Sequence, residues 1–162
     1  MAVGEALGPR GGRFSGIPFT SEVQVCGGQR GFQGEQSSAR SVLYSERTAT
    51  IFWEEMYPWQ GRFLAWNIFP FHPHRAGDPL SLRPPTPVEI RLFAPILQEM
   101  IACVAPRFII AIGRKAEIGL REINVDCQYI RHPSHGGEKA FREGIKKIPS
   151  LLSGRGVSTH PE

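Results

Sequence analysis

The chain has 162 residues, of which 41% are hydrophobic and 21% charged, values that exclude a disordered chain and favour one compact domain. Its 19 lysines and arginines exceed its 15 acidic residues, and the resulting net charge of +4 suits a polyanionic partner without establishing one. Three widely separated cysteines exclude a disulfide framework and a metal knuckle, so we expect no metal and no cofactor. No segment has the length of a membrane span and no signal peptide is evident, which predicts a cytoplasmic protein without a membrane partner.

The first feature along the chain is a glycine-rich loop. Ala2 and Val3 have the character of a strand end, and Gly4 and Gly8 allow the backbone to turn sharply. Glu5 then stands at the carboxyl end of a strand, where open α/β sheets bind their ligands. Because four residues are few for a central strand, we expect this strand to begin upstream of the first methionine.

The next segment combines a stiffened loop with exposed basic residues. Ile17-Pro18-Phe19 places an aromatic ring where it can face whatever lies above Glu5. Arg10 and Arg13 belong to a Gly- and Arg-rich loop that can reach phosphates. Residues 23–40 show little periodicity, which predicts a mobile surface loop.

A helix and a buried strand follow. Apolar residues at helical spacing predict a helix capped by Thr48 and ended before Pro58. Residues 63–66 are apolar and predict a buried strand. This strand brings Asn67 to the same edge of the sheet as Glu5.

The longest predicted helix follows a proline-rich connection over residues 72–85. Thr86 is a capping residue, Pro87 occupies the first helical position and Glu89 the third, which together form a strong helix start. Apolar residues then recur every three or four positions until Pro106, so one face of this helix is expected to pack on the sheet.

The remaining elements again alternate between strand and helix. Residues 108–112 are continuously apolar and β-branched, as is typical of a parallel strand covered on both faces. A short helix is predicted over residues 114–122 and another strand over residues 127–131. His132 begins the loop after that strand, and residues 138–148 fit a last helix.

This alternation predicts an α/β fold. Right-handed crossovers between parallel strands give a three-layer α/β/α sandwich around a central parallel sheet of about four strands. We expect the domain to span residues 1–148 and residues 149–162, rich in Gly, Ser and Pro, to form a flexible tail.

Three motifs together resemble the uracil-DNA glycosylase superfamily. Its members have a Gly-rich first motif ending in Gly-x-Pro-Phe, an Asn closing a central strand and a late His-Pro-Ser. This chain carries Gly4 to Phe19, Asn67 and His132-Pro133-Ser134 in the same order, and the resemblance covers residues 2–147. It lacks the four cysteines of the iron–sulfur branch, having only Cys26, Cys103 and Cys127.

The resemblance implies a role for each matching residue. Glu5 orients water or offsets positive charge on the sugar, and His132 stabilises the departing base. Phe19 stacks on the extruded base and Asn67 reads its edge. Further substrate contacts are expected at Gly4, Ala6 and Ser134, and DNA contacts at Arg10, Arg13, Arg114 and His135. The chain departs from the superfamily pattern at two positions. Many relatives have Pro where Leu7 stands, and several have Asp or Asn at the position of Ala6. Because Ala6 has no carboxylate, Glu5 is the only carboxylate in this motif.

We therefore expect a monomeric DNA glycosylase that removes uracil or another deaminated base from DNA. The runner-up is a silent or truncated relative that binds damaged or single-stranded DNA without cleaving it. A third alternative, an unrelated phosphate hydrolase, lacks a Gly-Lys-Ser/Thr ending to its glycine loop. A metal set of His72, His74 and His135 is less favoured because no metal-binding spacing accompanies them. Taken singly, Phe19, Asn67 and His132 also fit structural roles.

Overall fold

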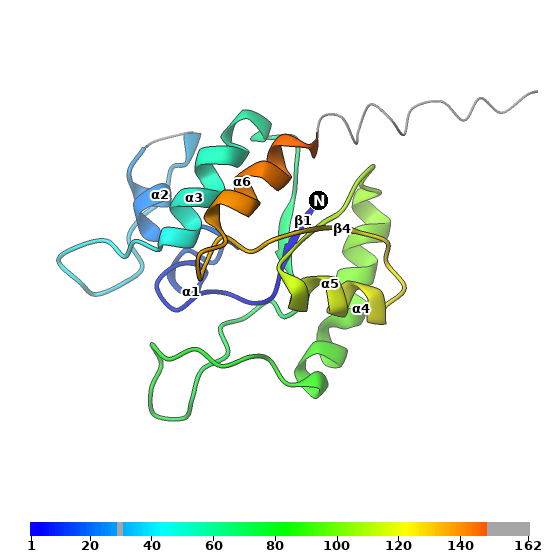
Figure 1. Ribbon diagram of the computed structural model, residues 1–162. Helices are drawn as coiled ribbons and strands as arrows, with labels where there is room; N and C mark the ends of the chain where they lie inside the picture. The colour runs from blue at the N-terminus through cyan, green and yellow to red at the C-terminus, as the bar shows by residue number, and fades with distance from the viewer. Residues whose placement is uncertain (29–30, 149–162) are drawn as a thin grey trace, which may run out of the picture.

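The structure is a computed structural model that describes residues 1–28 and 31–148. Its centre is a four-stranded, all-parallel sheet in the order β2-β1-β3-β4 (Figure 1). The strands are β1 (Ala2–Gly4), β2 (Ala65–Asn67), β3 (Ile110–Ile112) and β4 (Gln128–Ile130). Val3 of β1 pairs with Trp66 of β2 and Ala111 of β3, so the first strand lies inside the sheet. Every predicted strand is present, although β2, β3 and β4 are shorter than the predicted segments.

Helices cover both faces of this sheet, which confirms the predicted three-layer α/β/α sandwich. They are α1 (Gly12–Ser15), α2 (Glu22–Cys26), α3 (Arg47–Met56), the 3-10 helix η2 (Tyr57–Trp59), α4 (Pro87–Val104), α5 (Arg114–Glu122) and α6 (Glu138–Lys146). Figure 1 shows α3 and α6 on one side of the strands and α4 and α5 on the other. Alternate residues of β1 accordingly enter two cores, with Ala2 among the α3 and α6 side chains and Val3 among those of α4 and α5.

Local signals located some helices well. The Thr86 hydroxyl accepts the backbone N–H of Glu89 at 3.2 Å, and the Glu89 carboxylate accepts the N–H of Thr86 at 2.7 Å, which is the predicted capping box. Helix α5 has the predicted bounds. The prediction for Thr48 was wrong, because α3 begins at Arg47 and Glu46 occupies its cap position.

The prediction of a mobile loop over residues 23–40 was also wrong in part. Residues 22–26 form α2, which begins with a capping box between Ser21 and Gln24. The buried carboxylate of Glu22 accepts backbone N–H groups of Ser38 and Tyr44 at 2.7 and 2.9 Å. A long-range anchor of this kind leaves no periodic signal in the sequence.

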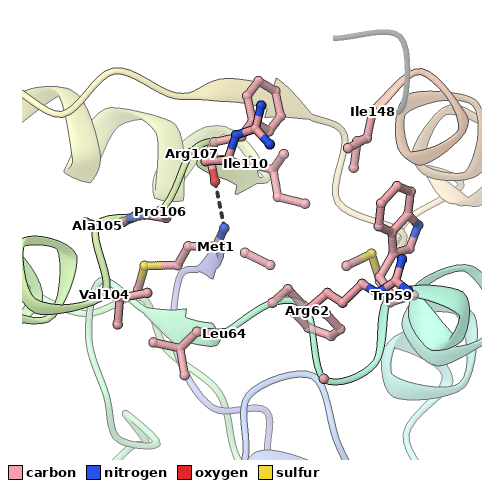
Figure 2. Close-up of a pocket in the computed structure, with 15 residues that line it drawn as sticks. Met1, Trp59, Arg62, Leu64, Val104, Ala105, Pro106, Arg107, Ile110 and Ile148 are labelled. Atoms are coloured by element: carbon pink, nitrogen blue, oxygen red, sulfur yellow. Dashed lines mark hydrogen bonds between the residues drawn. The ribbon is translucent and has the colours of Figure 1, made fainter. Parts of the chain in front are cut away.

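The amino-terminal edge of the sheet carries an apolar cavity of about 580 Å³ that contains none of the predicted site residues (Figure 2). Beside it, the Met1 ammonium donates a 2.6 Å hydrogen bond to the carbonyl of Phe108. Burial lowers the pKa of this amino group. Among the helices of the described residues, none is both long and apolar enough to cross a membrane. The predicted tail over residues 149–162 lies outside the described residues.

Candidate active site

The first loop is held in place by the chain that follows β2. The backbone N–H of Ile68 donates to the carbonyl of Gly4 at 2.9 Å, and that of Phe69 donates to the carbonyl of Glu5 at 3.0 Å. The N–H of Leu7 returns a 3.0 Å bond to Phe71. These bonds extend the β1–β2 pairing past the sheet, so Glu5 is fixed beside the segment that directly follows Asn67.

A second cavity, of about 480 Å³, lies at this carboxyl edge of the sheet. Residues from five separate segments line it, as expected for the ligand-binding edge of a parallel sheet. The predicted site residues among them are Glu5, Ala6, Phe19, Arg114, His132, Ser134 and His135. The cavity is also lined by four charged residues that were not predicted to take part in catalysis or DNA binding: Glu46, Arg83, Lys115 and Arg131.

Gly4 and Asn67 lie against the Phe19 ring. A Cβ on Gly4 would lie 2.5 Å from Cζ of Phe19 and 2.6 Å from Oδ1 of Asn67, so only glycine fits there. Asn67 is 2% exposed, and its Nδ2 has no hydrogen-bond partner among the described residues. Because an unpaired buried donor is costly, this amide is poised for a ligand that supplies an acceptor.

Phe19 serves both the core and the cavity. Its ring stacks on Phe52 with centroids 4.6 Å apart and planes 13° from parallel. Its backbone φ of +55° is rare for a bulky residue. The ring is only partly buried, and it lines the cavity beside Asn67. The Phe19 ring can therefore have both roles, packing on Phe52 in the core and offering a stacking surface to the cavity.

His132 is held as a neutral donor. Its Nδ1 accepts the backbone N–H of Ser134 at 3.2 Å and lies 2.7 Å from the Ser134 hydroxyl. Because Nδ1 accepts, the proton of the neutral ring is on Nε2. Burial, followed by the charges of Arg131 and His135, lowers the pKa of His132 to about 4. The ring thus stays neutral near pH 7.

The basic residues differ in how free they are to meet DNA. Arg114 donates to Glu117 and lies over the ring of Tyr129 at 4.7 Å while lining the cavity. Arg13 donates to the carbonyl of Pro79 and does not line the cavity. Arg10 is exposed outside the lining, and exposed His135 lies at its rim. No motif pointed to Lys115 as a catalytic residue, and its Nζ donates to Oε1 of Glu5 at 2.9 Å.

A second carboxyl group of the cavity, Glu46, was missed by sequence reasoning. A Cβ on Gly8 or Gly11 would lie 2.3 or 2.6 Å from its Oε2, so the first loop wraps tightly around it. Within residues 1–28 and 31–148 this buried oxygen has no partner, although the carboxylate accepts the backbone N–H of Arg10. Burial raises the pKa of Glu46. No motif could have indicated it, because its partners are backbone atoms far away in the sequence.

The histidines outside the late motif do not form a metal site with it. His72 places Nδ1 2.8 Å from the carbonyl of Leu7, and its ring stacks on His74 with centroids 5.8 Å apart. Across residues 1–28 and 31–148, no cluster of three or more His, Cys, Asp or Glu side chains is arranged to hold a metal ion.

Comparison with known families decides the family of this chain. A family model described as the Uracil DNA glycosylase superfamily matches residues 1–161. The chain belongs to this superfamily. No individual curated protein matches it. The resemblance drawn from Gly4, Phe19, Asn67 and His132 is thereby confirmed at the level of the family. Membership of the uracil-DNA glycosylase superfamily indicates a glycosylase-type activity with DNA as the partner.

Proposed function

We propose that this protein hydrolyses the N-glycosidic bond of uracil, or of another deaminated base, in DNA and leaves an abasic site for base excision repair. The observation that carries the proposal is that three of the predicted groups line one cavity and a fourth lies next to one of them. Glu5, Phe19 and neutral His132 line it, and the unpartnered amide of Asn67 lies beside Phe19. Superfamily membership supports the glycosylase class.

Binding in this proposal requires a nucleotide turned out of the DNA helix. The extruded base would stack on the ring of Phe19, a contact worth about 1–3 kcal/mol per base. The Asn67 amide would use Nδ2 and Oδ1 to donate to and accept from the edge of the base. Uracil presents a carbonyl and an N–H side by side, which matches one amide group.

Base release would then proceed by breaking the bond between C1′ of the sugar and the base nitrogen. The bonding electrons leave with the base, and the Nε2–H of His132 hydrogen bonds the oxygen where negative charge builds. A neutral donor avoids the cost of a buried cation. The Glu5 carboxylate would offset the oxocarbenium-like charge or orient the water that adds to C1′. The proton that this water loses neutralises the departing base anion, so the products are the free base and a hydroxyl group on C1′.

The direct test incubates the protein with single-stranded and duplex oligonucleotides that carry one uracil and then cleaves abasic sites with alkali. Cleavage at the uracil position, with none when thymine stands there, supports the proposal. Protein produced in a host without its own uracil-DNA glycosylase, together with Glu5→Gln and His132→Ala variants, controls for a contaminating enzyme. Parallel substrates with hypoxanthine or xanthine identify a different preferred base.

The second candidate is a relative that binds DNA lesions without cleaving them. Ala6 favours this alternative, because a residue that several superfamily members use to orient water is missing. Anisotropy with the same oligonucleotides separates the two candidates. Tight binding of the uracil-containing strand without alkali-labile product would establish the binding protein and contradict the proposed hydrolase.

A further inference from the structure

Lys115 and Glu5 come together because their strands are neighbours. Glu5 follows β1 and Lys115 is the second residue of α5, directly after β3. These strands pair in parallel with Val3 opposite Ala111, so both segments leave the sheet at its carboxyl edge. The Nζ of Lys115 donates to Oε1 of Glu5 at 2.9 Å, and both side chains line the cavity.

The three arginines that line this cavity are paired with groups other than Glu5. Arg83 holds Glu89 through two bonds of 2.6 and 2.8 Å, and Arg114 holds Glu117. Arg131 donates to the carbonyl of His135 at 3.5 Å. Within the described part of the chain, Lys115 is therefore the cavity cation that is paired with the candidate catalytic carboxylate.

We propose that Lys115 is a positioning residue that fixes the Glu5 carboxylate for base release, an inference that rests on the proposed function. Holding Oε1 leaves Oε2 to face water or the sugar. Glu5 is long and only partly buried, and the side chain of the adjacent Ala6 has no polar atom that could orient it or the water. A misplacement of about 1 Å in a reacting group can cost about a hundredfold in rate.

Ion pairs that are this exposed contribute little to stability, since Lys115 and Glu5 side chains are 57% and 32% exposed. Removing the lysine should therefore leave the melting temperature nearly unchanged. The proposed role predicts a loss in the rate of the chemical step instead. A competing role is binding of a DNA phosphate by the same ammonium group, which would show as a loss of affinity.

The test is a double-mutant cycle on Lys115→Met and Glu5→Gln, measured by single-turnover base release at saturating uracil-containing DNA. We expect Lys115→Met to slow release about 10- to 100-fold with DNA affinity nearly unchanged. The same substitution should cause no further loss in the Glu5→Gln background. Lys115→Arg should recover part of the rate. Lys139→Met, an exposed lysine on α6, is the matched control and should leave release unchanged.

Equal fold losses in the two backgrounds, or unchanged release, would overturn the positioning role. A loss confined to affinity would make Lys115 a phosphate contact. If the unmodified protein releases no base, the proposed function itself fails, and the ion pair is tested separately by the ¹³C chemical shift of the Glu5 carboxyl group. A shift that Lys115→Met leaves unchanged would show that the pair does not form.

Discussion

A Cβ on Gly113 would lie 3.2 Å from the Cβ of His132, so this glycine makes room for the histidine at the cavity. Gly113 also has a φ of +96° and a ψ of 156°, a conformation essentially restricted to glycine. We expect Gly113→Ala to cost about 1–3 kcal/mol of stability and to displace the imidazole, which slows base release. Denaturant unfolding and single-turnover kinetics measure the two effects.

Gly61→Ala is the matched control for this substitution. Gly61 also has a positive φ, +78°, but no atom of the part of the chain that the structure describes lies within 4 Å of a Cβ built there. It should lose stability through backbone strain while retaining the rate of base release. A similar loss of rate in both variants would contradict this role, because the loss would then come from backbone strain and not from displacement of His132.

Removing the imidazole should mainly affect the chemical step. We expect His132→Ala to lower single-turnover base release about a hundred- to a thousandfold, as for other donors to a developing anion, with only a modest loss of DNA affinity. His74→Ala removes an exposed histidine outside the cavity and should leave release unchanged. Equal losses of binding and release for His132→Ala would instead make His132 a DNA-positioning residue.

The pH dependence of release should reflect the protonation of His132. Because its pKa is lowered to about 4, the ring stays neutral as the pH falls through 6.5, and its contribution to rate should fall only near pH 4. As the pH falls, the unfolded chain binds the proton before the folded protein does. The stability from this group is therefore present above pH 6.5 and is lost as the pH falls toward 4.

Ser134 is expected to help keep His132 neutral. In Ser134→Ala, loss of the hydroxyl that bonds Nδ1 should move the acid limb of the rate profile to higher pH. An unmoved limb would remove Ser134 from this role.

Asn67 is expected to select the base. Asn67→Ala leaves the polar edge of the bound base unpaired, so base release should slow by about tenfold or more. Asn67→Asp replaces the unpartnered amide donor with an acceptor, so the ratio of rates between uracil and cytosine should change. Competition between the two substrates measures this ratio. Unchanged kinetics in both variants would place Asn67 outside the site.

The two aromatic roles of Phe19 can be separated with a matched pair of substitutions. Phe19→Leu removes the ring that stacks on Phe52, and Phe14→Leu removes a ring that stacks on Tyr44 at 4.3 Å outside the cavity. Both should lower the melting temperature, because each loses an aromatic pair worth about 0.5–1.5 kcal/mol. Only Phe19→Leu should slow base release. Equal release by both variants would leave Phe19 with a packing role alone.

Glu46 should make the folding stability of the protein depend on pH. Because burial raises its pKa above 4.5, the native state holds this proton more tightly than the unfolded chain, so stability falls as the pH rises above 4.5. We expect Glu46→Gln to raise the melting temperature at pH 7, with the gain disappearing toward pH 4. Glu89→Gln should do the opposite, because Arg83 lowers the pKa of Glu89 to about 2. A destabilised Glu46→Gln protein at pH 7 would contradict the assignment.

The sequence alone determined the features that depend on neighbouring residues. The start of α4 follows from Thr86 and Glu89, whose capping bonds span three residues. The strand identity of residues 110–112 follows from a continuous β-branched run, since only a strand covered on both faces buries such a run. The motifs around Gly4, Asn67 and His132 carried the family for the same reason, because each is a short, local pattern.

Only the tertiary structure decided how groups that are distant in sequence act on one another. The pairing of β1 with β3 brings Lys115 to Glu5, although 110 positions separate them. The first loop closes on Glu46 through backbone contacts that no side-chain pattern records. Whether His132 is neutral likewise depends on its burial and on the Ser134 bonds to Nδ1. Desolvation and pairing depend on distances in space, and these distances exist only once the sheet has set its strand order.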